Sequence, residues 1–239
     1  MDQFPNLLTH IEVKQFYDET YYCGAVRSAK IPRHFRWLAS KIGVRTNQRV
    51  LDVACGTGQW LLAVQARGAQ PTGVDLSTTA TAICRTIMPN GEFHACPAEA
   101  LPFQAGQFDV VSCLGALEHF LDPHAALNEM IRVANDEAPF LLLVPNAGFW
   151  MRRVSLYQGT TQAAVHEDVR TLREWQELFD LSGLHVIQRW RDLHVLSWAW
   201  ITARKWYWIP FRAIQAALLT ILPLDWQYQV YHLCRKRGH

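Results

Sequence analysis

The chain has 239 residues, of which 50% are hydrophobic and 18% are charged. This balance is typical of a folded globular protein and excludes long disordered regions. A chain of this length can bury one large core, so we expect one domain with insertions. The formal net charge of +2 gives no general reason to expect a nucleic-acid partner.

The cysteines and the apolar runs indicate the cellular compartment of the protein. The six cysteines include no CxxC pair and no histidine at metal-ligand spacing, which predicts free thiols, a reducing compartment and no metal site. The N-terminal residues lack the basic start and apolar run of a signal peptide. The longest apolar stretch, 213–224, contains Gln215 and Thr220 and is too short to span a bilayer. We therefore expect a cytoplasmic protein.

From residue 48 to about 190, short apolar runs alternate with amphipathic segments of helical length. The predicted strands are 49–54, 71–75, 92–94, 108–113, 140–144 and 184–191, and a seventh, 228–235, closes the sheet. Predicted helices follow at 59–67, 77–88, 122–134 and 171–183. Their starts are marked by Ser77, by Asp122 before Pro123, and by a capping box from Thr171 to Glu174.

This alternation predicts an α/β fold with a doubly wound, Rossmann-like sheet of seven strands. Residues 1–47 are helical in part and precede the main domain, which spans 48–239. Two stretches interrupt the alternation: 147–170, which is irregular, and 192–223, which is rich in Trp and Leu. We expect both to be insertions, the second one helical.

A glycine turn and a carboxylate carry the strongest functional signal. Gly56 and Gly58 lie between the first strand and the first helix, where backbone N–H groups can face a ligand and a larger side chain would hold it away. Asp75 ends the second strand, beside that turn in a doubly wound sheet, and can accept hydrogen bonds from both hydroxyls of a ribose. Together they predict a nucleoside site. Taken singly, they are also explained by a tight turn and a helix-capping carboxylate.

The same geometry serves NAD-dependent oxidoreductases, so the two cofactor classes must be separated. A dinucleotide site needs a third Gly or Ala three residues after the second glycine, and this chain has Leu61 there. Asp52, near the end of the first strand, would instead face the amino-acid part of a cofactor, a group that NAD lacks. The glycine count therefore disfavours an NAD enzyme.

Five segments, VLDVACGTG, GVDLS, AEALPF, FDVVSCLGALEHF and LLLVPN, carry a family resemblance. In order and spacing they resemble the class I S-adenosylmethionine (SAM)-dependent methyltransferases related to the ubiquinone and menaquinone biosynthesis enzymes, of the methyltransferase type 11 group. The resemblance covers residues 48 to about 190 and is specific to fold and cofactor, hardly at all to substrate. The rival outside enzymes, a non-catalytic SAM-binding or membrane-docking protein, is disfavoured by the intact set Asp52, Gly56, Gly58 and Asp75.

The resemblance implies a cofactor site that takes SAM and releases S-adenosylhomocysteine. Its implied residues are Asp52, Ala54, Gly56, Gly58, Asp75, Leu76, Ala98, Glu99 and Leu114. Asp52 and the glycine loop would hold the methionyl end, Asp75 the ribose, and Leu76 the adenine. Pro97 stands where many relatives carry Asp, and it offers no side-chain hydrogen bond to the adenine amine.

In the resembled family, the segment after the fourth strand lies beside the sulfonium. This makes Glu118 and His119 the candidate catalytic groups. A neutral His119 can act as a general base; alternatively, it caps or packs under the following helix. Methyl transfer from a sulfonium depends largely on alignment, so an essential base is not required.

Two flanking segments remain. Phe16–Tyr22 holds four aromatic residues, and related enzymes use such a segment as a lid, which singles out Tyr17 and Tyr22 as cofactor-binding; ordinary core packing is the alternative. Farther on, Trp residues alternate with Arg204, Lys205 and Arg212, as in interfacial segments. Three interpretations stay open for 196–222: peripheral membrane contact, an apolar substrate pocket, and a helical cap packed on the sheet or on another subunit of a homo-oligomer.

Substrate choice in the resembled family usually lies in insertions, so we expect 147–170 and 192–223 to line the acceptor site. The expected acceptor is a sizeable, partly apolar small molecule that is methylated at oxygen. A quinone precursor, a lipid-linked or surface-glycan sugar and a secondary metabolite all fit this description.

Overall fold

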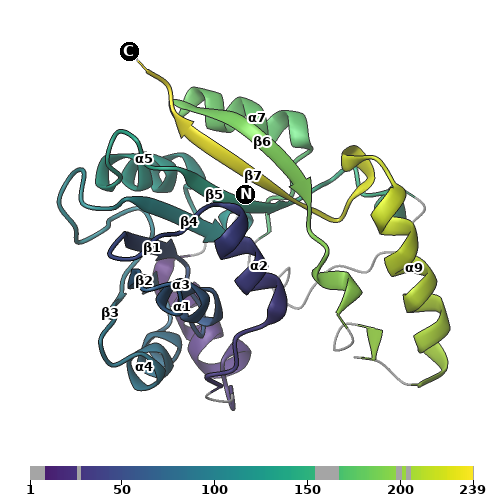
Figure 1. The fold of residues 1–239 in the computed structure, drawn as a ribbon, viewed down its shortest axis with the longest axis horizontal. Coiled ribbons are helices and arrows are strands. Elements are labelled where there is room, and N and C mark those ends of the chain that lie inside the picture. The colour runs from purple at the N-terminus through teal and green to yellow at the C-terminus, as the bar shows by residue number, and fades with distance from the viewer. Residues whose placement is uncertain (1–8, 26–27, 154–166, 198–200, 203–205, 239) are drawn as a thin grey trace, which may run out of the picture.

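A computed structural model describes residues 9–25, 28–153, 167–197, 201–202 and 206–238 (Figure 1). Within these residues, seven strands form one sheet in the order β3-β2-β1-β4-β5-β7-β6. The strands are β1 (Arg49–Val53), β2 (Gln70–Asp75), β3 (Glu92–Ala95), β4 (Val110–Leu114), β5 (Phe140–Pro145), β6 (Leu184–Arg191) and β7 (Gln229–Lys236). The predicted α/β fold with a doubly wound sheet is confirmed.

Going across the sheet from β3 to β6, the strand pairs change once from parallel to antiparallel. The five strands from β3 to β5 are parallel, whereas β7 lies antiparallel between β5 and β6. The carboxyl ends of β1, β2 and β4 therefore meet at one edge of the sheet, where ligands bind in open α/β sheets.

The helices of the sheet region begin where the sequence predicts them. They are α3 (Gln59–Gln65), α4 (Thr78–Ile87), α5 (Pro123–Val133) and α7 (Leu172–Leu181). The Ser77 hydroxyl accepts a hydrogen bond from Ala80 N, and Asp122 accepts one from Ala125 N. Thr171 and Glu174 form both bonds of a capping box. Because these caps are local, the sequence alone was sufficient to locate the helix starts.

Two cores form because successive strand residues point to opposite faces of the sheet. On one face, Leu51, Val111 and Leu142 pack with residues of α5 and α7, including the fully buried Trp175 and Phe179. On the other face, Val50, Val110 and Leu141 pack with residues of α3 and of α2 (Arg33–Lys41). The sheet is thus covered on both faces, as the continuous apolar strands require.

The remaining helices belong to the flanks. Before the sheet, α1 (His10–Phe16) runs into a π-helical turn, η1 (Tyr17–Tyr21). After β5 comes the short α6 (Trp150–Arg153), and between β6 and β7 lies α9 (Ile209–Ile221). Short 3-10 turns occur at η2 (Leu117–His119), η4 (His194–Leu196), η5 (Trp206–Trp208) and η6 (Leu224–Trp226). None of the helices in the described part of the chain has the length and apolar character needed to cross a membrane.

Helix α9 lies within the stretch that we expected to be a helical insertion. Its Ala216 and Leu219 pack against Phe149 and Met151 in a small cluster of their own. In Figure 1 it stands at the edge of the molecule, apart from the helices that cover the sheet. The division into residues 1–47 and 48–239 stays a prediction, and residues 154–166 of the first insertion lie outside the described residues.

Candidate functional site

A cavity of about 280 Å³ opens at the carboxyl ends of β1, β2 and β4. Its wall contains most of the residues that the sequence singles out: Tyr17, Tyr22, Asp52, Ala54, Gly56, Asp75, Leu76, Ala98, Glu99, Leu114 and His119. Gly58 and Glu118 do not line it. Segments from the N-terminal helices and from four strand ends thus meet around one space.

Asp75 and the glycine turn are joined directly. Gly56 N donates a hydrogen bond to Asp75 Oδ2 (2.8 Å), and Ser77 N donates one to Asp75 Oδ1 (2.9 Å). Burial raises the pKa of the Asp75 carboxyl to about 6, although these two backbone bonds oppose the rise. Each carboxylate oxygen has a second lone pair, so Asp75 can still accept hydrogen bonds from a ligand. The two features predicted to converge do so.

Asp52 supplies a second carboxyl to the same wall. Ser112 Oγ donates a hydrogen bond to Asp52 Oδ1 (2.7 Å) and accepts one from Trp60 Nε1 (2.9 Å). Burial raises the pKa of Asp52 to about 7, and the nearby Asp75 adds to the rise. A cationic group placed beside these carboxyls would stabilise their charged forms. The site therefore favours a ligand that carries positive charge.

Ala54, between Asp52 and the glycine turn, has a φ of 60°. This left-handed conformation is uncommon for a residue with a Cβ and is held by the surrounding structure. It turns the chain out of β1 and into the cavity wall.

Gly58 corrects one expectation from the sequence. It caps α3 with a φ of 75°, and a Cβ built there would lie 2.6 Å from Met88 Cε and 2.8 Å from Cys84 Sγ. The space is filled by the end of α4, so the constraint on Gly58 is packing and not the approach of a ligand. At Gly56 the constraint does come from the cavity, since a Cβ would lie 3.1 Å from Tyr22 Oη.

The aromatic segment before the sheet closes over the glycine turn. Tyr17, Tyr21 and Tyr22 pack edge to face or tilted, with ring centroids 4.9–6.0 Å apart. All three line the cavity. Burial, together with the charge of Asp75, raises the pKa of Tyr22, so its hydroxyl stays neutral.

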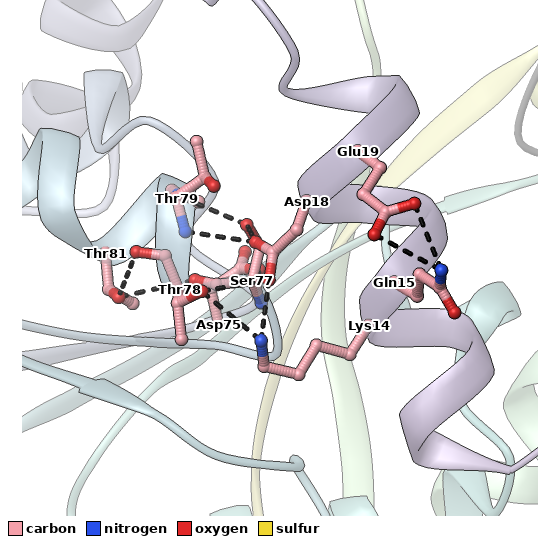
Figure 2. A network of polar contacts seen from close by, with 10 residues as sticks. Lys14, Gln15, Asp18, Glu19, Asp75, Ser77, Thr78, Thr79 and Thr81 are labelled. Carbon is pink, nitrogen blue, oxygen red and sulfur yellow. Dashed lines mark hydrogen bonds and ion pairs between the residues drawn. The ribbon is translucent and has the colours of Figure 1, made fainter.

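A polar network, which we call the Asp18 latch, fastens this segment to the start of α4 (Figure 2). Asp18 accepts hydrogen bonds from the hydroxyls of Ser77 and Thr78 and from Thr79 N (3.0 Å), and Lys14 Nζ lies 2.6 Å from Asp18 Oδ2. Burial would raise the pKa of Asp18, but these bonds hold it below its usual range. Because Ser77 also donates to Asp75, the latch and the cavity share one network.

The Asp18 latch could not be found from the sequence, because the partners of Asp18 at the start of α4 lie about sixty residues away and only the fold brings them together. A second polar contact of this segment is longer: His10 Nε2 lies 3.3 Å from Glu99 Oε2.

Phe35 and Trp60, from α2 and α3, also line the cavity, with ring centroids 6.0 Å apart. The position of Trp60 directly after the glycine turn was an available signal, whereas nothing in residues 1–47 placed α2.

His119 and Glu118 follow β4 in the turn η2, and the structure separates them. His119 is buried and lines the cavity, with its Nε2 3.8 Å from Glu118 Oε1. Glu118 lies behind it, and burial raises the pKa of its carboxyl to about 8. Within the described residues, Glu118 Oε2 has no hydrogen-bond partner. Glu118 thus lies next to a residue of the cavity wall without lining the cavity itself, and its role near the reaction stays a prediction.

The expectation that the insertions line the acceptor site stays a prediction, because residues 154–166 and part of the second insertion lie outside the described residues. Where the structure describes residues 147–170 and 192–223, none of them lines the cavity. Helix α9 packs on Phe149 and Met151, and none of its residues lines the cavity. The apolar part of the wall is supplied instead by residues such as Phe35, Trp60 and Phe120.

With this geometry established, comparison with known proteins assigns the central region. Residues 50–137 match a family model described as "Methyltransferase domain". This region is a methyltransferase domain. The domain holds β1 to β4, the glycine turn, Asp75 and His119, and it supplies most of the cavity wall. The rest of the wall comes from the N-terminal helices.

Individual relatives agree with the domain assignment. The chain is similar to the ubiquinone biosynthesis O-methyltransferase of Bordetella avium (strain 197N), with 38% identity over 101 residues. That match covers 40% of this chain and 42% of the relative, so the chain aligns with less than half of that protein's length.

Two solved structures share the fold of the methyltransferase domain and of its flanks. The YcgJ protein of Bacillus subtilis superposes with a TM-score of 0.59 and 22% identity, covering 87% of this chain and 100% of that one. A 1,6-didemethyltoxoflavin-N1-methyltransferase of Burkholderia thailandensis, solved with bound substrate and S-adenosylhomocysteine, gives 0.60 and 17%, covering 96% and 87%. At these identities the likeness shows the fold alone.

Proposed function

We propose that the chain is a SAM-dependent methyltransferase that transfers a methyl group to an oxygen atom of a sizeable, partly apolar small molecule. The observation that carries the proposal is the contact between Gly56 N and Asp75 at the wall of the cavity. The methyltransferase domain over residues 50–137 supports it, as do the names of the relatives.

The residues of the cavity fit SAM. Asp75 accepts hydrogen bonds from the ribose hydroxyls, while Leu76 and Ala98 offer apolar surface to adenine. Asp52 holds the cationic amino group, which restores the charge that burial disfavours. SAM supplies a methyl group already activated on a sulfonium, so the protein has to orient the two reactants and exclude water. Tyr17 and Tyr22 cover the site.

His119 accepts the proton of the acceptor hydroxyl in this proposal, because it lines the cavity and its neutral imidazole can act as a base. Glu118 is a positioning residue behind it, neutral at physiological pH because its pKa is raised to about 8. The acceptor lies between Phe35, Trp60 and Phe120, whose rings favour a partly apolar molecule. A quinone precursor, a lipid-linked sugar and an aromatic metabolite fit this chemistry.

Cofactor binding is tested by titration calorimetry with SAM and S-adenosylhomocysteine. We expect Asp75→Asn to weaken both ligands about tenfold to a hundredfold, because two charge-assisted hydrogen bonds become neutral ones. Asp136→Asn, at a fully exposed carboxyl, is the matched control and should bind like the parent. Equal affinities for the parent and Asp75→Asn would refute the ribose contact.

The role of His119 is tested once an acceptor has been found by screening extracts with isotope-labelled SAM. We expect His119→Ala to lower kcat by about 10² and to leave SAM affinity within about twofold. Glu118→Gln, which mimics the neutral acid, should keep most of the activity and the pH profile. An unchanged kcat for His119→Ala would show that His119 only packs under α5.

A further inference from the structure

A chain of hydrogen bonds reaches Asp52 from inside the protein. Trp60 Nε1, in the first turn of α3, donates to Ser112 Oγ on β4 (2.9 Å), and Ser112 Oγ donates to Asp52 Oδ1 (2.7 Å). Ser112 is paired with Asp52 across β4 and β1, so both side chains point to the same face of the sheet. Trp60 and Asp52 line the cavity, whereas Ser112 is fully buried and does not. Ser112 can therefore influence a ligand only through the residues that it contacts.

The hydroxyl of Ser112 has one proton and two acceptors within reach. Asp52 Oδ1 lies 2.7 Å from Ser112 Oγ, and the main-chain oxygen of Leu51 lies 3.1 Å from it. The indole N–H of Trp60 can only donate, so it occupies a lone pair of the hydroxyl oxygen and leaves the proton for one of these acceptors. A carboxylate is the stronger acceptor, because a hydrogen bond to a charged group is roughly twice as strong as a neutral one. Ser112 therefore donates to Asp52 whenever that carboxyl is ionised.

The surroundings of Asp52 otherwise disfavour its charge. Burial raises the pKa of Asp52 to about 7, the Ser112 hydrogen bond opposes the rise, and Asp75 on β2 adds to it. Two thiols near Asp52 stay neutral, because a hydrogen bond to a neighbouring thiol raises the pKa of Cys55 and burial raises that of Cys113. Among the described residues no basic side chain acts on Asp52. Within this part of the chain, the Ser112 hydroxyl is thus the side-chain group that favours the ionised carboxyl.

We propose that Ser112 is a positioning residue for cofactor binding, which keeps the carboxyl of Asp52 charged and aimed at the amino group of SAM. The inference rests on the proposed function, in which Asp52 holds that group. Because Ser112 engages Oδ1, the carboxyl cannot turn freely, and Oδ2 remains to accept a hydrogen bond from the ligand.

The same hydroxyl also serves the neutral form of Asp52. When that carboxyl is protonated, it can donate to the second lone pair of Ser112 Oγ while the hydroxyl turns its proton to Leu51 O. Both charge states of Asp52 are therefore satisfied inside the protein. The ammonium group of the ligand selects the charged one.

The test is titration calorimetry with two ligands at pH 7. S-adenosylhomocysteine carries the amino group, whereas 5′-methylthioadenosine has the same nucleoside and sulfur without the amino-acid part. We expect Ser112→Ala to weaken S-adenosylhomocysteine about tenfold, because Asp52 is less ionised and less fixed, and to leave 5′-methylthioadenosine within about twofold. Ser112→Cys, whose S–H is a weak donor, should show the same loss, and Ser112→Thr should stay within about threefold of the parent.

Ser182→Ala is the matched control. Ser182 is a buried serine at the end of α7, and its hydroxyl donates to the main-chain oxygen of Leu178. This variant should bind both ligands like the parent, because Ser182 does not line the cavity. All variants should keep the parent's circular dichroism spectrum.

A pH profile separates the positioning role from a purely structural one. Without the Ser112 hydrogen bond, the pKa of Asp52 should be about one pH unit higher, so that less of the carboxyl is ionised at pH 7. The affinity ratio between the parent and Ser112→Ala for S-adenosylhomocysteine should therefore narrow to about twofold at pH 9, where both carboxyls are ionised. In the ligand-free proteins, carbon-13 NMR of the Asp52 carboxyl should show the same displacement from a parent midpoint at about pH 7.

The outcomes distinguish this inference from the proposed function. If the parent binds S-adenosylhomocysteine and Ser112→Ala binds it as tightly as Ser182→Ala does, the inference is overturned while the proposed function stands. It is also overturned if Ser112→Ala weakens both ligands equally, or if the NMR midpoint of Asp52 does not move, since Ser112 would then serve packing alone. A parent that binds neither ligand refutes the proposed function, and the inference with it.

Discussion

Asp52 and Asp75 are buried carboxyls whose pKa values are raised to about 7 and about 6 by burial. A folded-state pKa above the unfolded one means that the folded protein binds more protons. Its stability is then fully present at low pH and falls as pH rises through the folded pKa. The ionised carboxyls therefore destabilise the folded protein until a cation binds beside them. A ligand that carries positive charge should thus raise the stability of the folded protein.

Asp52→Asn should relieve this destabilisation. Between pH 5 and pH 8 the parent should lose on the order of 3 kcal/mol of unfolding free energy that the variant keeps, because the variant has no proton to release. Urea denaturation at the two pH values measures the difference. The same variant should bind SAM weakly at every pH, whereas the parent's affinity should fall below pH 7. Parallel stability profiles for the two proteins would contradict the raised pKa.

Gly58→Ala tests the correction made at the second glycine. The new Cβ meets both a left-handed φ and the side chains of Cys84 and Met88. We expect a loss of about 2–4 kcal/mol in unfolding free energy. Gly106→Ala is the control, since Gly106 has a similar φ of 68° in open space and should cost only about 1 kcal/mol. Equal losses would remove the packing explanation.

At the scale of elements, α1 and η1 are held to α4 by the Asp18 latch. Asp18 accepts three hydrogen bonds at the start of α4, beside the site of Asp75. The latch places the tyrosines of η1 over the cavity, so the order of this segment and the affinity for SAM should change together.

Asp18→Asn should loosen the segment, because a neutral amide accepts hydrogen bonds more weakly and loses the ion pair with Lys14. We expect faster amide hydrogen exchange over residues 10–22 and about fivefold weaker SAM binding. Glu19→Gln is the control, since Glu19 contacts Gln15 on the side away from α4 (Figure 2). Unchanged exchange in Asp18→Asn would show that the latch holds nothing in place.

These elements also show what the sequence can and cannot supply. Strands β1, β2 and β5 and the helix starts at Ser77 and Thr171 were predictable, since periodicity and caps are local. The packing of Gly58 against Cys84, and the contact of Asp18 with α4, depend on tertiary structure. The sequence did not predict α2 as a distinct element. It lies before the first strand, outside the alternation of strands and helices that located the other helices.

For the whole molecule, the order of the last strands in the sheet is the feature that the sequence did not predict. The sequence indicated β6 and β7, but local pattern could not show that β7 lies between β5 and β6. The same limit applies to the cavity wall, to which α2 and α3 contribute Phe35 and Trp60 among the described residues. The contribution of the insertions to the acceptor site stays a prediction.

A chain ending at Tyr228 should fail to fold cooperatively. It lacks β7, which pairs along its length with both β5 and β6, and it leaves the fully buried Phe140, Leu142 and Val144 of β5 beside an open edge. Thermal melts followed by circular dichroism should show no sharp transition. A chain ending at Lys236, which keeps β7, should melt like the parent. A cooperative melt of the shorter chain would mean that β7 is dispensable.

The inserted position of β7 has a consequence for biosynthesis. During translation β6 leaves the ribosome well before β7, and its backbone groups have no neighbour in the sheet until β7 emerges. Over that interval the edge of β5 and the edge of β6 that β7 will cover are both unpaired. Chaperone capture, or a slow codon run within residues 192–228, would therefore influence the yield of native protein more than similar events earlier in the message.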